Sequence, residues 1–101
     1  MVLVIFRSRL REGVENEYGP VAKRMSELVS GMPGFISFKT FAAPDGERVS
    51  IMEFETEEAV EAWRKHSEHL VAQQRGRQEF YSEYQVQVCP NVHAYGFKSE
   101  S

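Results

Sequence analysis

Residues 35–54, FISFKTFAAPDGERVSIMEF, hold two runs rich in Phe, Ile and Val on either side of a short turn. The turn, residues 43–47, carries a proline and a glycine where hairpin turns favour them. We therefore expect a strand over residues 35–42 that pairs with a second strand over residues 48–55. The rest of the fold can be built outward from this hairpin.

Before the hairpin, apolar residues recur at spacings of three and four, which is typical of a helix packed on one side. They are Val14, Tyr18, Val21, Met25 and Leu28. Gly19-Pro20 interrupts this pattern. Because Pro20 cannot donate a backbone hydrogen bond, we expect a kink or a fresh helix start there.

After the hairpin, Thr56 is a candidate N-cap, and the two glutamates that follow it suit the positive end of a helix. We expect this second helix to run to about Arg75, with Gly76 as its stop. Ser67 is a candidate cap for a second segment within it.

Residues 2–10 and 80–89 are rich in apolar and aromatic side chains and are expected to form the first and last strands. Residues 92–97 are expected to continue as an edge strand, and residues 98–101 to form a frayed tail. The predicted order is β-α-β-β-α-β, a ferredoxin-like α+β fold with two helices on one face of an antiparallel sheet. A chain of this length, 1–101, is expected to form one domain.

Alternation along the first strand places Val2, Val4 and Phe6 on one face and Leu3 and Ile5 on the other. A strand that is apolar on both sides is expected to be buried on both sides, but two helices cover only one face. A second copy of the chain is the simplest cover for the other face, so we expect a homodimer.

The same alternation predicts opposite faces for other aromatic pairs. It separates Phe35 from Phe38 in the second strand and Tyr81 from Tyr84 in the last.

The composition limits the class of protein. The chain is 42% hydrophobic with a net charge of −3 and a pI of about 5.6, which argues against nucleic acid or an anionic membrane as partner. Its one cysteine, Cys89, excludes an intrachain disulfide. The apolar run at the N-terminus is too short to span a membrane and lacks the leading positive charge of a signal peptide. We expect a cytoplasmic protein.

The stretch AWRKHSEHL, residues 62–70, carries most of the candidate chemistry. On one continuous helix Trp63, His66 and Leu70 share a stripe that faces the sheet, and His69 lies beside it. The functional interpretation is an apolar pocket with one titratable imidazole. The structural interpretation is that Trp63 fills the core and His66 is a hydrogen-bonded core histidine.

Other kinds of site have weaker support. His66 and His69 are near neighbours on a helix and His93 could join them at a metal ion, but no further ligand stands at a telling spacing. No glycine-rich nucleotide fingerprint and no nucleophile elbow is present. In the last strand, Tyr81 and Tyr84 could donate hydrogen bonds to a substrate oxygen.

Several short motifs together resemble the antibiotic biosynthesis monooxygenase (ABM) domain family, over residues 2–97. They are Glu15-Asn16-Glu17-Tyr18, Met32-Pro33-Gly34-Phe35, Glu53-Phe54, Ala62-Trp63-Arg64 with His66 and His69, Phe80-Tyr81, and Gln87-Val88-Cys89. The resemblance implies a dimeric α+β barrel, in which the sheets of two subunits pack together. Members include cofactor-free oxygenases of quinols and polyketide aromatics, and haem-degrading enzymes.

Haem-degrading members use an Asn on the first strand, a Trp on the second helix and a later His as haem ligand. Trp63 matches the tryptophan, but Phe6 and Gln73 stand near the other two positions. We therefore expect no haem, no metal and no other cofactor.

The resulting hypothesis is a cofactor-independent monooxygenase of a small electron-rich aromatic or quinol, with His66 as general base and Trp63 as the second catalytic residue. The expected substrate-binding residues are Phe6, His69, Leu70 and Tyr84. The alternative is a non-catalytic dimeric module that binds a small molecule or haem.

Overall fold

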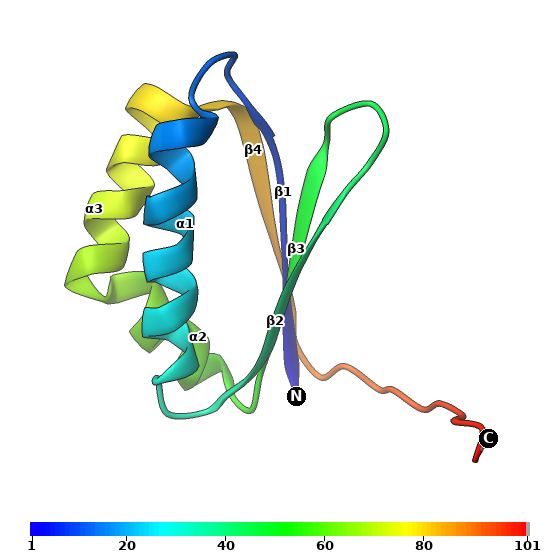
Figure 1. Ribbon diagram of the computed structural model, residues 1–101. Helices are drawn as coiled ribbons and strands as arrows, with labels where there is room; N and C mark the ends of the chain where they lie inside the picture. The colour runs from blue at the N-terminus through cyan, green and yellow to red at the C-terminus, as the bar shows by residue number, and fades with distance from the viewer. Residues whose placement is uncertain (101) are drawn as a thin grey trace.

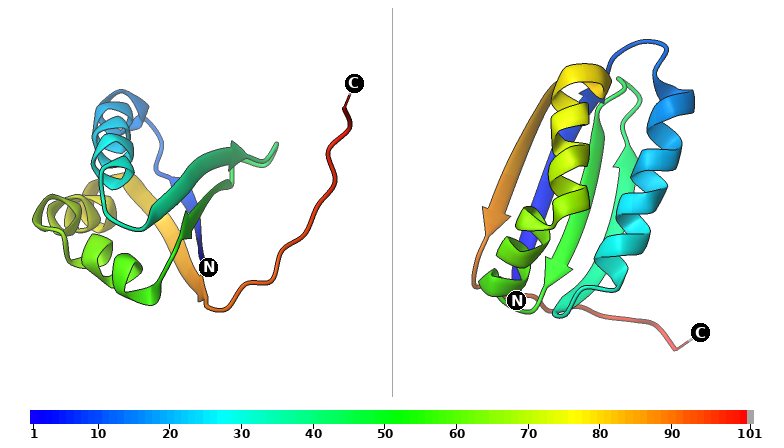
Figure 2. Two further views of the ribbon diagram at one scale, coloured as in Figure 1. Left: turned by 90° about the horizontal axis from the view of Figure 1, so that it is seen from below. Right: turned by 90° about the vertical axis from the view of Figure 1, so that its left-hand side faces the viewer.

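The structure, a computed structural model that describes residues 1–100, is a four-stranded antiparallel sheet with helices on one face (Figures 1 and 2). The sheet order is β2-β3-β1-β4, which confirms the predicted ferredoxin-like α+β arrangement. The elements are β1 (Val2–Leu10), α1 (Glu15–Ser30), β2 (Phe35–Ala42), β3 (Arg48–Phe54), α2 (Glu57–Lys65), α3 (Ser67–Arg75), a π-helical turn (Gly76–Phe80) and β4 (Tyr81–Cys89). No helix in this described part of the chain is long and apolar enough to cross a membrane.

The first helix, α1, runs unbroken through Gly19-Pro20, so the expected fresh start does not occur. Because Pro20 lies in the second turn, its missing N–H leaves only one intrahelical bond unmade. The helix ends at Gly31, whose N–H bonds to the carbonyl oxygens of Leu28 and Val29.

The second helix divides at His66 into α2 and α3, so the single stripe predicted for Trp63, His66 and Leu70 is wrong. Thr56 caps α2 as expected, because its hydroxyl accepts a bond from the Ala59 N–H at 3.1 Å. The cap of α3 is His66 and not Ser67. His66 has an extended ψ of 131°, which turns the chain before α3 begins.

The turn after α3 is held by Arg11 from the loop that follows β1. Its guanidinium donates to the carbonyl oxygens of Arg77, Gln78 and Tyr81 at 2.9–3.0 Å. These bonds satisfy carbonyl groups that the end of a helix leaves without partners. The turn thereby leads directly into β4.

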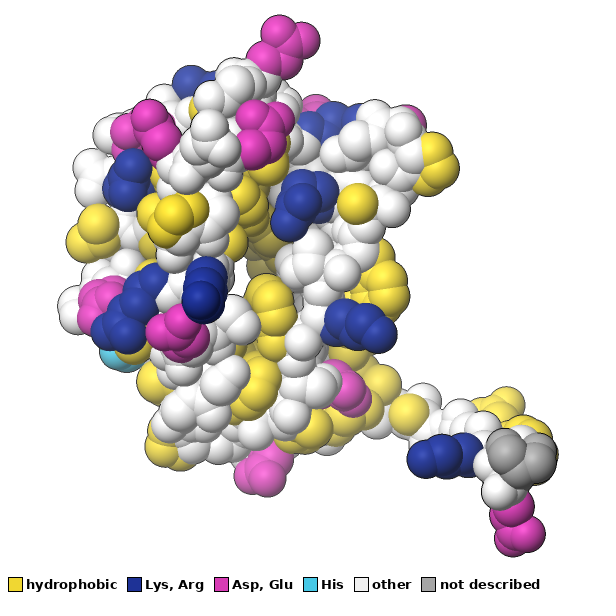
Figure 3. Space-filling view, viewed as in Figure 1, with side chains coloured by type: hydrophobic (Ala, Val, Ile, Leu, Met, Phe, Trp, Pro, Cys, Tyr) yellow, Lys and Arg dark blue, Asp and Glu magenta, His cyan; other side chains and the backbone are white. Residues whose placement is uncertain are grey.

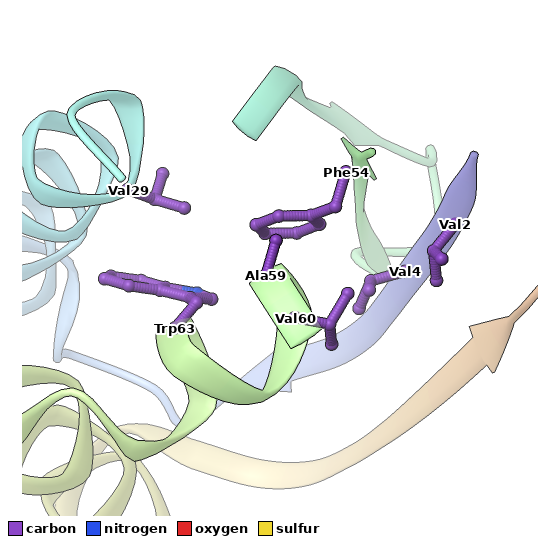
Figure 4. Close-up of a cluster of buried hydrophobic side chains, with 7 residues drawn as sticks. All are labelled: Val2, Val4, Val29, Phe54, Ala59, Val60 and Trp63. Atoms are coloured by element: carbon purple, nitrogen blue, oxygen red, sulfur yellow. The ribbon is translucent and has the colours of Figure 1, made fainter. Parts of the chain in front are cut away.

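The core lies between α2, the end of α1, and the β1–β3 pair (Figure 4). It consists of seven buried side chains: Val2, Val4, Val29, Phe54, Ala59, Val60 and Trp63. Val2 and Val4 therefore face the helices, as the alternation predicted, and Leu3 and Ile5 face the open side of the sheet.

Two β-bulges reverse faces that simple alternation assigned wrongly. The register of β2 shifts between Phe35 and Ser37, so Phe35 and Phe38 pair with Phe54 and Met52 and both lie on the helix side. In the same way β4 shifts opposite Arg9 and Leu10, so that Tyr81 and Tyr84 share the helix side. Each extra residue moves one aromatic ring from the open face to the face that the helices cover.

Residues 92–97 form no strand, which corrects the expected edge strand. Val92 donates one backbone bond to Met1 at 3.1 Å, and the chain then extends away from the sheet (Figure 1). Tyr95 and Phe97 are 96% and 94% exposed there. The expected frayed tail spans residues 98–101, and residue 101 lies outside the described residues.

Candidate functional site

The helical layer is not closed over the sheet. Figure 3 shows the molecule hollowed between the helices and the β2–β3 hairpin, with hydrophobic side chains inside the hollow. A separate groove of about 470 Å³ runs between α1 and α3. It is lined by Pro20, Val21, Arg24, Met25, Ser67, Glu68, Val71, Ala72 and Arg75. An ion pair between Arg24 and Glu68, 3.1 Å long, joins the two sides of this groove.

A smaller hollow of about 250 Å³ lies beside charged residues of the open sheet face. Its charges are already paired: Arg7 bonds to both carboxylate oxygens of Glu47 at 3.1 Å, and Arg9 contacts Asp45 and Glu83 at 3.0 and 3.2 Å. Because these charges are already paired, a base or cation that is available to a ligand is more readily found on the helix side of the sheet.

Trp63 lies at the inner end of α2 and is 5% exposed. Figure 4 shows its indole ring extending from α2 toward Val29 of α1. Its Nε1 donates no hydrogen bond to any residue among 1–100. Trp63 is therefore a core residue, as the structural interpretation held, with an indole N–H that the protein leaves unused.

The ring of His69 stacks on Trp63, with centroids 4.0 Å apart and 14° between the planes. His69 Nδ1 lies 3.0 Å from the Trp63 carbonyl oxygen. The Gln73 amide nitrogen also lies 3.4 Å from Nδ1, but it donates to the Arg64 carbonyl oxygen at a shorter 3.1 Å. Because a carbonyl oxygen can only accept, the shorter contact to Trp63 assigns the proton to Nδ1 and leaves the lone pair on Nε2. Burial lowers the pKa of His69, although the bond to Trp63 opposes this shift. His69 is therefore held as a neutral base.

His66 is placed differently. Its Nδ1 accepts a bond from the Glu68 N–H at 3.2 Å, which caps α3. Its ring centroid is 6.0 Å from that of Trp63, in a tilted arrangement. The lone pair of Nδ1 is thus already used in holding the helix.

The remaining predicted residues lie apart from the Trp63–His69 pair. Phe6 and Tyr84 meet on the helix side of the sheet with centroids 5.5 Å apart. Leu70 is 50% exposed on α3, as expected once the helix divides before it. The predicted site residues thus form two separate groups. One is the Trp63–His69 pair of α2 and α3, and the other is the Phe6–Tyr84 pair of β1 and β4.

Tyr18 also belongs to the second group, although its sequence pattern indicated only a helix position. Tyr81 donates to the Tyr18 hydroxyl at 3.1 Å, and the two rings lie 5.7 Å apart. Arg48 lies over the Tyr18 ring, 5.6 Å from its centroid. No motif marks these residues, because they come from three separate elements and meet only in the folded chain.

Metal ligands do not gather in the structure. Within residues 1–100, no three side chains of His, Cys, Asp or Glu lie close enough to hold a metal ion. His93, the third histidine, lies in the C-terminal segment beside Tyr95, with ring centroids 6.3 Å apart.

Comparison with known proteins gives the family. Residues 1–75 match the model of the antibiotic biosynthesis monooxygenase family. A curated relative, the uncharacterized protein YqjZ of Bacillus subtilis (strain 168), is 34% identical over 86 residues, which cover 85% of this chain and 75% of that protein.

Solved structures share the fold at low sequence identity. A putative antibiotic biosynthesis monooxygenase from Deinococcus radiodurans has a TM-score of 0.84 at 7% identity, covering 98% of this chain and 100% of that one. A mutant of SnoaB, a cofactor-independent oxygenase from Streptomyces nogalater, has a TM-score of 0.74 at 17% identity, covering 99% and 93%. The family match and the relative together show that this chain belongs to the antibiotic biosynthesis monooxygenase family.

Proposed function

We propose that this chain is a cofactor-independent monooxygenase of a small, electron-rich aromatic such as a phenol or quinol. The family and the fold of a cofactor-independent oxygenase support the reaction class. The observation that carries the proposal is the neutral His69 stacked on the buried Trp63. A base beside an apolar wall suits removal of a proton from a phenolic substrate.

The reaction balances without a cofactor. A phenol that loses its proton becomes an anion rich enough in electrons to reduce oxygen. One oxygen atom then replaces a ring hydrogen as a new carbonyl, and the other leaves as water. The four electrons that oxygen accepts all come from the substrate, so the protein supplies the base, the binding surface and exclusion of water.

We assign the base to His69 and not to His66. His69 Nε2 has a lone pair, since Nδ1 donates to the Trp63 carbonyl. To act through Nε2, His66 would need its proton on Nδ1, which would break the bond from Glu68 that caps α3. In this proposal Trp63 provides the wall of the site, and its unused Nε1 is a donor for a substrate oxygen.

Oxygen uptake with a panel of naphthols and quinols tests the proposal. His69→Asn is the main variant, since the Asn amide can still donate to the Trp63 carbonyl but offers no base. His66→Asn is the matched control, since Asn is a good helix cap. Loss of a general base should reduce turnover by roughly 10²-fold or more in His69→Asn, with His66→Asn close to wild type.

Two results would count against the proposal. Equal turnover by His69→Asn and wild type would remove His69 from the mechanism. No uptake with any substrate, combined with saturable binding of a naphthol or of haem by the wild type, would favour the non-catalytic binding module.

We also propose that the functional unit is a homodimer that pairs the open sheet faces. Leu3, Ile5, Val49 and Ile51 lie on this face and are only partly buried in one chain. Phe41, on the same face, is 49% exposed. An apolar sheet face of this kind is normally covered, and a second copy of the chain has a matching one.

A further inference from the structure

Arg48 differs from the other arginines at its end of the sheet. Arg7 and Arg9 lie on the open face and pair with carboxylates. Arg48 is half-buried, and its register pairing with Ser8 and Ala42 places it on the helix side. Within residues 1–100, it forms no ion pair, and its guanidinium instead lies over the Tyr18 ring. A cation left without a counter-ion in a partly desolvated place favours an anion there.

A hydroxyl pair beside Arg48 adds a directed donor. Tyr81 donates to the Tyr18 hydroxyl, so Tyr18 keeps its own proton for a further acceptor. Nothing in the described chain accepts it. Burial raises the pKa of Tyr81, so this phenol stays protonated and continues to donate. A donor that itself receives a hydrogen bond is strengthened toward the next acceptor.

Aromatic rings surround this donor pair. The ring centroid of Phe6 lies 5.4 Å from that of Tyr81 and 5.5 Å from that of Tyr84. The ring centroids of Phe80 and Tyr18 are 5.5 Å apart. Such rings bind a flat aromatic ligand through edge-to-face and stacked contacts. The local chemistry is therefore a cation and a hydroxyl donor beside an aromatic surface.

We propose that Arg48 and the Tyr18–Tyr81 pair bind a carboxylate carried by an aromatic ligand. This inference goes beyond the proposed function: it assigns a second ligand site, on the helix side of the sheet but apart from the Trp63–His69 pair, to an aromatic carboxylate. Arg48 supplies the charge and two N–H donors that match a carboxylate. The Tyr18 hydroxyl supplies the third donor, and Phe6 and Tyr84 contact the ring.

The test compares two probes that differ only in the carboxylate, 1-hydroxy-2-naphthoate and 1-naphthol. Binding is measured by calorimetry without oxygen, so the result does not depend on turnover. Wild type should bind the carboxylate probe more tightly by roughly 10-fold or more, as expected for a charge-assisted contact. Arg48→Met should lose that preference, and Tyr18→Phe should reduce it by about 2- to 10-fold.

Arg7→Met is the matched control, since it removes the same charge from the open face of the same sheet end. It should keep the preference of the wild type. Equal loss in Arg7→Met and Arg48→Met would show an effect of net charge and overturn the inference, as would equal affinity of wild type for both probes. A folded Arg48→Met protein, verified by circular dichroism, is required for the comparison. Should Arg48→Met not fold, an unaltered preference in Tyr18→Phe would overturn the inference.

The outcomes separate this inference from the proposed function. Carboxylate preference that depends on Arg48, without oxygen uptake, would keep the binding site and reject the oxygenase. Oxygen uptake that depends on His69, with no carboxylate preference, would keep the oxygenase and reject this site.

Discussion

The imidazole of His69 stacks on the indole of Trp63 at 4.0 Å between ring centroids, and its Nδ1 lies 3.0 Å from the carbonyl oxygen of the same tryptophan. These two contacts fix the plane of the imidazole and its tautomer at once. They also place a titratable group directly against the only tryptophan of the chain. Its protonation can therefore be measured through the fluorescence of Trp63.

The first prediction concerns the pKa of His69. Burial lowers it, so the midpoint of the titration should lie below the ordinary value of about 6.5. A change of charge on a ring in contact with the indole alters its emission, so fluorescence against pH should report this midpoint. His69→Phe should abolish the transition, and His93→Ala should leave it intact. A midpoint at or above the ordinary value would contradict the burial argument.

The same shift predicts how stability depends on pH. Because the pKa of His69 is lower in the folded state, the unfolded chain binds the proton more tightly, and stability rises with pH across this range. The contribution of His69 is fully present above about pH 6.5. It is lost as the pH falls toward the folded pKa. Urea unfolding between pH 5 and pH 8 should show a shallower slope in His69→Phe than in wild type or His93→Ala; parallel slopes would refute this.

The third prediction tests the division between α2 and α3. His66 caps α3 through a bond from the Glu68 N–H to its Nδ1. Loss of a cap in His66→Ala should reduce the free energy of unfolding by about 1 kcal/mol. His66→Asn, which can accept the same bond, should restore most of this loss. Urea denaturation of the three proteins decides the matter, and equal destabilisation by Ala and Asn would show that the cap is not what His66 contributes.

The order of helices and strands could be predicted because each pattern is local. The N-cap at Thr56 and the turn between β2 and β3 depend on residues close together in sequence. The two β-bulges could not be predicted, since one extra residue leaves no mark in a run such as residues 35–42. Each bulge nevertheless reverses the face of every side chain beyond it.

The Trp63–His69 pair was hidden for a related reason. On a continuous helix, residues six apart point to different sides, because each residue adds about 100°. The extended backbone at His66 resets that phase and brings His69 over Trp63. The sequence did indicate a helix cap near this point, at Ser67, one residue after the true cap at His66. The stacking of His69 on Trp63 could not be predicted from that cap, because it depends on the direction that α3 takes after the break.

The fourth prediction compares two glycines of the turn before β2. Gly34 has φ of +83°, and a Cβ added there would lie 2.7 Å from the Ala59 Cβ in the core. Gly34→Ala should therefore destabilise the fold by roughly 2 kcal/mol or more, through backbone strain and overpacking. Gly31, with φ of −93° and a nearest contact of 3.7 Å, is the control, and Gly31→Ala should be nearly neutral. Similar melting temperatures for the two variants would contradict the packing of α2 on this turn.

The last prediction tests the proposed homodimer through the open sheet face. Ile5 pairs with Ile51 on one side and Gln87 on the other, at the centre of that face. A glutamate there would place an unpaired charge between two apposed sheets, so Ile5→Glu should shift the protein from dimer to monomer.

Leu70→Glu is the control for that experiment, because Leu70 is 50% exposed on α3, in the helical layer. It adds the same charge and should leave the dimer intact. Sedimentation velocity at micromolar concentration measures both. A monomeric wild type would reject the dimer outright. A dimer that persists in Ile5→Glu but dissociates in Leu70→Glu would place the interface on the helical layer and reject the pairing of open sheet faces.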